Sequence, residues 1–399
     1  MTDVGLSGLV TGPLADQAEA AGLVLPGVGR QCLGTVLPAV ADALGADLGV
    51  DLGGAGSRAT IGLPEADRVC VVLVDGVGYT NLAERAGHAP FLRPRLAGST
   101  PLTSTFPSTT ATAMGTFGVA VPPGGTGMLG YTVRVPGSGH LGNLVSWTDM
   151  PPAQRWQRRP SMFERLVESG IAVTSVGPAR FAGSGLTLAA LRGAAYTPAE
   201  SLAARVDATV AALRKPGLAY LYWGDVDKAG HHHGWGSWQW GDALAELDDE
   251  LARLARSVPR GTAILVTADH GMVDVDLGAR WDVAETPALA ADVDLVAGEP
   301  RALHLHLRAG ADADQVRSTW ADVLGEHALV TTRDEAVTQG LFGEVDDWVA
   351  PVIGDVVVAM TGRATVVDSR TQTPASLDLV GVHGSLSGHE MLVPAIVIA

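Results

Sequence analysis

Four clusters of carboxylate and histidine side chains could do chemistry in this sequence. Histidine nitrogen and carboxylate oxygen are the ligands that zinc commonly takes in catalytic sites, where one coordination position stays open. Two carboxylates and a histidine can hold one ion, and a carboxylate with two histidines can hold a second. Two ions ~4 Å apart can stabilise both the attacking and the leaving oxygen of a phosphoryl displacement. The clusters are Asp75-Gly76, Asp225-Val-Asp227-Lys-Ala-Gly-His231, Asp269-His270-Gly271 and Val382-His383-Gly384.

Each cluster also has an ordinary explanation. An Asp-Gly pair after a strand is usually a turn, and the histidine triplet at 231–233 can bind metal adventitiously at a surface. The joint occurrence of all four clusters in one chain is what argues for a metal site. Asp227 and His231 are four residues apart, so on a helix they would share one face. The adjacent pair that begins at Asp269 needs an irregular loop to converge, which Gly271 permits.

Hydrophobic runs predict the elements that would bring these clusters together. Continuous apolar strands usually have both faces covered, as in open α/β sheets. Here they alternate with helical patterns, and this alternation predicts a doubly wound, mostly parallel central sheet. Ligands bind beyond the carboxyl ends of such strands, and Asp75 and Asp269 both lie at a strand end. The predicted strands are 69–75, 171–176, 218–223 and 262–269, and the predicted helices are 161–169, 200–213 and 242–257.

The patterns divide the chain into three parts. Residues 1–65 are expected to pack on the core as an N-terminal extension. Residues 66–280 and 351–399 are predicted to form the catalytic core. Residues 281–350 have a different character, with an alternating strand at 302–307 followed by helical segments, and are predicted to form a small inserted cap.

Composition limits the classes of function. A chain of 399 residues that is 47% hydrophobic can bury a large core. Its net charge of −16 argues against stable nucleic-acid binding, which needs a basic face, whereas bound cations would let an acidic protein handle phosphate. The two cysteines cannot form a disulfide framework. The opening MTDVGLSGLV lacks the features of a signal peptide, and no apolar run is long enough for a membrane span, so a cytoplasmic location is expected.

The order of the motifs resembles the nucleotide pyrophosphatase/phosphodiesterase branch of the alkaline phosphatase superfamily. The resemblance extends from about Val69 to the C-terminus, and the run 269–272 (Asp-His-Gly-Met) is its most specific part. It implies an alkaline phosphatase-like fold and two divalent ions, zinc or alternatively manganese. His389 competes with His383 as the last ligand, but the Gly-Ser that follows His383 matches the family's pattern. The matching positions are Asp75, Thr110, Asp269 and His270 for the first ion and Asp227, His231 and His383 for the second.

The resemblance offers two alignments for the nucleophilic threonine within 103–115. The Thr-Phe-Pro string resembles the eukaryotic-type diesterases and selects Thr105. Counting back from the Pro-Pro-Gly-x-x-Gly turn at 122–127 selects Thr110, and Pro-Ser-Thr-Thr resembles the nucleophile site of phosphonoacetate hydrolases. A hydroxyl at a helix start is also close to free N–H groups that favour an anion, and 111–117 can form that helix. Thr110 is therefore the predicted nucleophile, and a plain helix cap is the ordinary alternative.

The resemblance implies hydrolysis of phosphodiester or pyrophosphate bonds in nucleotide-like substrates, through a covalent phospho-threonine. The expected partner is therefore a small phosphate ester or nucleotide. The family's diesterases place an asparagine shortly after the nucleophile helix, where this chain has Gly130-Tyr131. It thus departs from the family at the usual contact to a phosphate oxygen. The alternatives are a phosphomonoesterase, a phosphonate hydrolase or a phosphomutase of the same superfamily, or a metal-binding scaffold without turnover.

Overall fold

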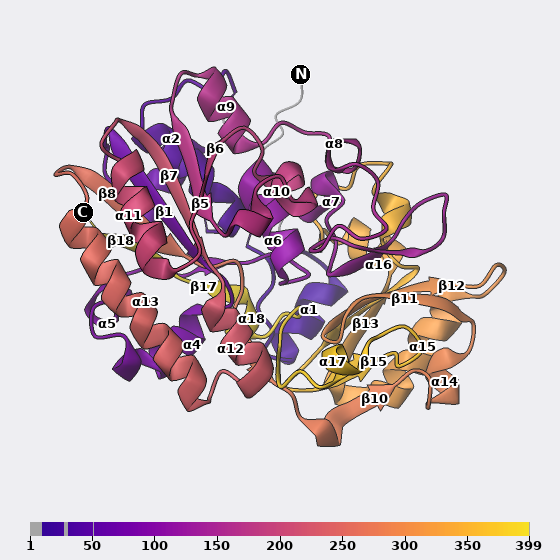
Figure 1. Ribbon diagram of the computed structural model, residues 1–399. Coiled ribbons are helices and arrows are strands. Elements are labelled where there is room, and N and C mark those ends of the chain that lie inside the picture. Colours follow the sequence, from indigo (N-terminus) through magenta and orange to yellow (C-terminus); the bar gives the residue numbers. More distant parts are fainter. Residues whose placement is uncertain (1–9, 28–30, 51, 399) are drawn as a thin grey trace.

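A six-stranded sheet forms the centre of the fold (Figure 1). The computed structural model describes residues 10–27, 31–50 and 52–398. Five strands of this sheet run parallel, and the edge strand at the C-terminus runs antiparallel. Its central strands are buried on both faces, which is why their sequences are almost continuously apolar. The order across the sheet is β18 (Ala395–Ile398), β8 (Thr262–Thr267), β1 (Arg68–Val74), β7 (Gly217–Trp223), β5 (Val173–Gly177) and β6 (Ala195–Pro198).

Helices cover this sheet, as the alternation of strands and helices predicts. One group is formed by α11 (Leu202–Ala212) and α13 (Trp238–Ser257), which pack against each other. A second group is formed by α2 (Val36–Ala43), α6 (Thr110–Val119) and α9 (Met162–Glu168), which also contact one another. Together with the sheet they enclose the largest hydrophobic core (Figure 1). The predicted doubly wound α/β fold is confirmed.

The predicted strands and helices of the core all form, close to their predicted ends. The largest difference is at α13, which begins at Trp238 rather than at Asp242. The reason is Ser237, whose side chain accepts a hydrogen bond from the Trp240 N–H at 3.2 Å and caps the helix one turn earlier. Helix α6 (Thr110–Val119) starts one residue before the helix predicted at 111–117 and includes all of it.

A second six-stranded sheet lies beside the first and is antiparallel throughout (Figure 1). One of its faces packs on α15 (Ala313–Leu324), where Trp320 is buried. The sheet extends beyond the predicted cap at 281–350, because two of its strands precede that segment and one follows it. The three-part division therefore does not coincide with the two sheets. The order is β13 (Ala328–Thr332), β14 (Val356–Met360), β12 (Ala302–Leu307), β11 (Val293–Glu299), β3 (Thr132–Arg134) and β4 (Leu141–Asn143).

The described part of the predicted N-terminal extension contacts both sheets. Helix α1 (Pro13–Ala20) contacts β13, whereas α2 lies in the main core and packs on α3 (Gly54–Ile61). Residues 1–9, 28–30 and 51 of the extension are outside the described part of the chain.

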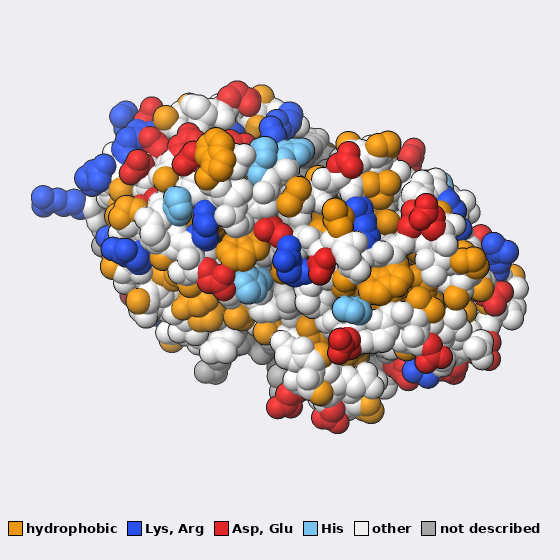
Figure 2. All heavy atoms as spheres, turned by 90° about the horizontal axis from the view of Figure 1, so that it is seen from below, with side chains coloured by type: hydrophobic (Ala, Val, Ile, Leu, Met, Phe, Trp, Pro, Cys, Tyr) orange, Lys and Arg blue, Asp and Glu red, His pale blue; other side chains and the backbone are white. Residues whose placement is uncertain are grey.

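The surface carries charges of both signs. On the face shown in Figure 2, Lys and Arg side chains are dispersed among Asp, Glu and His side chains. The expectation that nucleic acid is not a stable partner stays a prediction. In the part of the chain that the structure describes, no helix has both the length and the apolar character needed to cross a membrane. The cytoplasmic location stays a prediction.

Candidate active site

The predicted site residues lie beyond the carboxyl ends of three adjacent parallel strands. Asp75 directly follows β1, and the Asp269-His270 pair follows β8. Asp227 and His231 lie on α12 (Asp225–His233), which follows β7. Because these strands are neighbours in the sheet, their ends bring the three motifs together. Two further segments complete the site: Thr110 begins α6, and His383 follows the short strand β16 (Gly381–Val382).

The Nε2 atom of His270 is at the centre of the first group of ligands. It lies 3.4 Å from Asp75 Oδ1, 3.5 Å from Asp269 Oδ2 and 3.1 Å from Thr110 Oγ1. The His270 side chain is fully buried, and its Nδ1 atom lies 3.1 Å from the carbonyl oxygen of Gly271. That contact leaves Nε2 facing the carboxylates and the hydroxyl, which is the orientation a metal ligand needs.

The second group of ligands is built in the same way. Asp227 Oδ2 lies 3.2 Å from His231 Nε2, so the two residues share one helical face as predicted. His231 Nδ1 lies 2.7 Å from the Gly381 carbonyl oxygen, and His383 Nδ1 lies 3.0 Å from that of Ser108. Although burial lowers it, the Asp227 carboxylate raises the pKa of His231 to about 9 overall. Metal binding requires the neutral ring, so it would displace that proton.

Buried carboxylate oxygens without hydrogen-bond partners test whether metal ions fit this site. They are Asp75 Oδ1, Asp227 Oδ1 and Asp269 Oδ2. Burial, with the neighbouring carboxylates, raises the pKa of Asp75 well above its usual value, and burial also raises the pKa of Asp269. Buried carboxylates that lack partners are costly unless cations offset them.

Two sets of ligand atoms are close enough to hold one ion each. They are Asp75, Asp227 and His270, and Asp227, His231 and His383. Asp227 belongs to both sets, whereas the family pattern assigns it to the second ion. These oxygen and nitrogen donors fit divalent zinc.

Glycine allows the close packing of these motifs. Gly76 has a φ of 71°, and a Cβ atom there would lie 2.6 Å from Asp227 Oδ1. Its N–H donates a hydrogen bond to Asp269 Oδ1 at 3.2 Å. The Asp75-Gly76 pair is therefore a turn, as is usual after a strand. It is also the place where the motifs of Asp227 and Asp269 come into contact.

The two candidate nucleophiles have different surroundings. Thr110 is partly exposed and lines the cavity described below, with its hydroxyl directed at His270. Thr105 is buried, and its hydroxyl donates a hydrogen bond to the Pro107 carbonyl oxygen at 2.7 Å. At the N-cap of α6, Thr109 makes no capping hydrogen bond through its side chain. These contacts favour Thr110 over Thr105 and over a plain capping role.

The competing ligand candidates point elsewhere. His389 Nε2 lies 3.1 Å from Glu84 Oε1, and His389 belongs to neither set of ligand atoms. Asp225 and Lys228 are both exposed on α12. The structure thus brings His383, and not His389, to the cluster.

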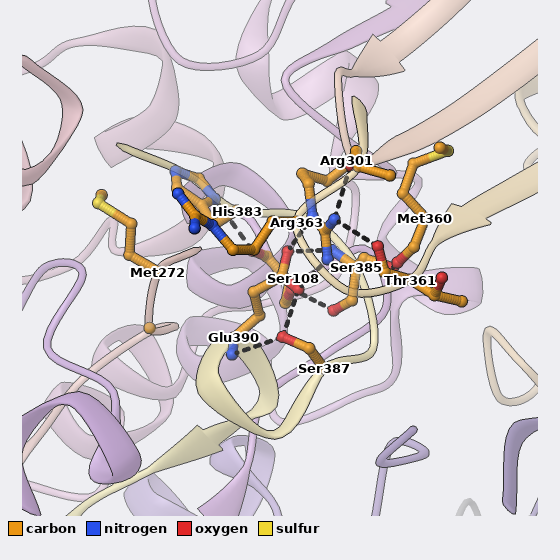
Figure 3. Close-up of polar contacts among 12 residues, drawn as sticks. Ser108, Met272, Arg301, Met360, Thr361, Arg363, His383, Ser385, Ser387 and Glu390 are labelled. Carbon is orange, nitrogen blue, oxygen red and sulfur yellow. Dashed lines mark hydrogen bonds and ion pairs between the residues drawn. The ribbon is translucent and has the colours of Figure 1, made fainter. Parts of the chain in front are cut away.

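Sequence reasoning missed a buried polar network behind His383 (Figure 3). Arg301 and Glu390 are both fully buried and form a two-point ion pair, with N···O distances of 3.0 and 2.7 Å. Glu390 Oε1 also accepts a hydrogen bond from the Ser385 N–H at 2.9 Å, and the Ser385 carbonyl oxygen accepts one from Ser108 Oγ at 2.6 Å. The network therefore joins the loop of His383 to the segment before Thr110. No local motif marks it.

Two more residues near the site were missed. Tyr222, at the end of β7, donates a hydrogen bond to Asp75 Oδ2 at 2.5 Å. Glu299, at the end of β11, accepts one from the Tyr131 N–H at 2.6 Å, and burial raises its pKa to about 8. Glu299 thus reaches the Gly130-Tyr131 position, where the chain departs from its family.

A cavity of about 610 Å³ opens beside the cluster, and Thr110, His383 and Glu299 are among the residues that line it.

Comparison with known proteins identifies the family. Residues 69–386 match the family model for type I phosphodiesterase / nucleotide pyrophosphatase. Murine ectonucleotide pyrophosphatase / phosphodiesterase 5 has a TM-score of 0.65 with 16% identity, over 82% of this chain and 87% of that chain. Phosphonoacetate hydrolase from Sinorhizobium meliloti 1021 has a TM-score of 0.64 with 21% identity, over 84% of this chain and 91% of that chain. No curated protein sequence is significantly similar.

The fold and the buried carboxylate–histidine site define a hydrolase of the alkaline phosphatase superfamily. Within that superfamily, the chain belongs to the type I phosphodiesterase / nucleotide pyrophosphatase family. The predicted family and fold class are confirmed. The structural matches support the fold alone, because their sequence identities are low. The family is metal-dependent, in agreement with the donor set of this site.

The metal content provides a direct test of the site. We expect elemental analysis after zinc reconstitution and desalting to approach two equivalents per chain. His383→Gln should lose one equivalent, because its ring belongs to one set of ligand atoms. His389→Gln is the matched control and should keep both. A chelator should abolish activity, and zinc or manganese should restore it. A wild-type value at or below one equivalent would contradict the paired-ion site.

Proposed function

We propose that this protein hydrolyses phosphodiesters through a covalent phospho-threonine formed on Thr110. The observation that carries the proposal is the position of the Thr110 hydroxyl at the start of α6, 3.1 Å from His270 Nε2 and among buried carboxylates. Two zinc ions would be held as the family pattern assigns them. The proposed ligands are Asp75, Thr110, Asp269 and His270 for the first ion and Asp227, His231 and His383 for the second.

A solved structure supports the threonine chemistry by analogy. It is an inactive threonine-to-alanine variant of the murine ectonucleotide pyrophosphatase / phosphodiesterase 5 in complex with AMP. Replacing that threonine by alanine thus accompanies loss of activity in that protein, which has the same fold at 15% identity. The only partly exposed hydroxyl that this chain directs at His270 is that of Thr110, among the hydrogen bonds of the described residues.

The proposed reaction has two steps at phosphorus. Thr110 Oγ forms a bond to phosphorus while the bond to the leaving alcohol breaks, and the hydroxyl proton ends on the released alcohol. A water oxygen then forms a bond to phosphorus while the bond between Thr110 Oγ and phosphorus breaks. One proton of that water restores the Thr110 hydroxyl, and the phosphate monoester is released. Bound metal ions would supply Lewis acidity that favours an ionised hydroxyl and stabilises charge on the phosphoryl oxygens. The free N–H groups at the start of α6 contribute a further positive environment for the phosphoryl group.

We expect phosphodiesters to be better substrates than phosphomonoesters. A monoester dianion carries extra charge that active sites usually meet with Arg, Lys or another metal ion. The sequence has no Arg or Lys between Arg95 and Arg134, and Lys228 is exposed on α12. The measurement is kcat/KM for bis-p-nitrophenyl phosphate against p-nitrophenyl phosphate, which release the same phenol. The diester should lead by at least about tenfold, or ~1.4 kcal/mol in transition-state binding.

A preference for the monoester would contradict the proposed diesterase function and would indicate a phosphatase of the same superfamily.

Hydrolysis of phosphonates is the second candidate function. In their favour are the Pro-Ser-Thr-Thr string around Thr110 and the fold shared with a phosphonoacetate hydrolase whose structure contains phosphonoacetate. Release of phosphate from phosphonoacetate, without turnover of diesters, would select that alternative.

A further inference from the structure

The composition of the cavity beside the site limits the substrates that it can hold. Its volume of about 610 Å³ is large enough for an organic group of considerable size. Beyond the metal ligands, its walls combine apolar and aromatic side chains with hydroxyl groups. Examples are Leu186, Leu191, Phe181, Tyr196, Ser175 and Thr187.

Lysine and arginine side chains are absent from the described lining of this cavity. The acidic residues outside the metal cluster are Glu299, whose pKa burial raises to about 8, and Asp368, which already forms an ion pair with Arg370 at 2.6 Å. Arg134 pairs with Asp294 at 3.6 Å.

Three further cations near the walls have partners of their own. Arg301 is fully buried against Glu390. Arg180 is exposed, with its guanidinium stacked over the Phe181 ring at 4.8 Å. Arg205 donates hydrogen bonds to the carbonyl oxygens of residues 199, 200 and 222.

The charges of the site and the cavity can be balanced against a substrate. A phosphodiester has one negative charge at phosphorus, which the metal ions and the start of α6 can offset. A second negative charge on the organic part would enter a space that offers it no cation. Such an unpaired anion loses its hydration without compensation, and this cost disfavours its binding.

We propose that the cavity holds an uncharged organic alcohol of the diester and discriminates against substrates with a second anionic group near the phosphorus. This inference rests on the proposed function and deepens it. It favours simple phosphodiesters over pyrophosphate bonds, in which a further phosphate lies beside the scissile one. It also disfavours phosphonates that carry a carboxylate. Apolar and aromatic walls bind an aryl or alkyl alcohol through burial of its surface.

Three matched diesters test the inference. Each has p-nitrophenol as one ester, and the second ester is phenyl, 4-carbamoylphenyl or 4-carboxyphenyl. The carbamoyl and carboxy groups have nearly the same size, so their kcat/KM ratio isolates the charge. At neutral pH and fixed ionic strength, we expect the carboxyphenyl ester to be at least tenfold poorer than the carbamoylphenyl ester.

A cation placed on the wall should weaken this discrimination. Thr187 lies on α10 (Gly185–Ala190), is partly exposed and lines the cavity. Thr187→Lys is expected to raise the carboxy-to-carbamoyl ratio at least threefold. Thr187→Gln, which has a similar length and no charge, should leave the ratio as in the wild type.

The outcomes separate this inference from the proposed function. If the wild type hydrolyses all three diesters and the carboxyphenyl ester is as good or better, the charge discrimination is wrong while the diesterase function stands. Loss of a carboxyphenyl preference in Arg180→Gln would then show that Arg180 reaches the cavity. If none of the three diesters is hydrolysed by zinc-loaded protein that does hydrolyse p-nitrophenyl phosphate or phosphonoacetate, the proposed function is wrong, and the inference falls with it.

Discussion

Thr110→Ala is expected to lower kcat for bis-p-nitrophenyl phosphate by about 10³-fold or more, since loss of a nucleophile removes the covalent route. Most of the bound metal should remain, because Thr110 is one of several proposed ligands of one ion. The loss should come from chemistry and not from folding, since the Thr110 hydroxyl is partly exposed and contacts His270 alone among its hydrogen-bond partners in the described structure. Acid-quenched wild type should yield a phosphorylated peptide that contains Thr110, and the variant should not.

Two variants serve as controls for this prediction. Thr105→Ala removes a buried hydroxyl that bonds only to the local Pro107 carbonyl, so it should cost about 1 kcal/mol of stability and leave most of kcat. Thr110→Ser keeps a hydroxyl at the start of α6 and should keep measurable turnover. If Thr105→Ala is the inactive variant and Thr110→Ala turns over normally, the alignment through the Thr-Phe-Pro string is right and Thr110 is not the nucleophile.

The parts of the fold that sequence predicts well are those fixed by local patterns. Continuous apolar runs identified β1, β7 and β8, because strands buried on both faces have few polar positions. The spacing of Asp227 and His231 predicted their contact, because a helix brings residues four apart onto one face. The strand-end position of Asp75 predicted its place in the cluster, because the chemistry of such sheets collects at one edge.

The parts that sequence did not predict depend on contacts between distant segments. Arg301 pairs with Glu390 across 89 positions, and Glu299 meets Tyr131 across 168. Neither contact has a period or a motif, since each joins residues that are far apart in the sequence. The short strands β3 and β4 were also missed. Three residues are too few to show alternation, and only pairing with β11 makes them part of the second sheet.

Arg301→Met is expected to lower the free energy of unfolding by about 3–5 kcal/mol, as measured by chemical denaturation of the metal-free protein. The change leaves the Glu390 carboxylate buried without its cation, and breaking one side of a buried ion pair costs this much. It also removes the hydrogen bonds that Arg301 donates to the carbonyl oxygens of Thr361 and Ala364. Arg253→Met is the matched control, because Arg253 makes two ion pairs at the surface. Its cost should stay below about 1 kcal/mol.

The same variant should weaken zinc binding, because the ion pair holds the loop that carries His383. The Glu390 side chain accepts a hydrogen bond from the Ser385 N–H, and its backbone carbonyl oxygen accepts one from the Gly271 N–H at 2.9 Å. Glu390 therefore fixes two metal-binding loops at once. Loss of a residue that orients ligands typically costs ~10–100-fold in metal affinity. Arg301→Met/Glu390→Gln removes both charges and should recover part of the stability without recovering the affinity. If Arg301→Met unfolds as Arg253→Met does and binds zinc as tightly as the wild type, the network neither stabilises the fold nor positions the site.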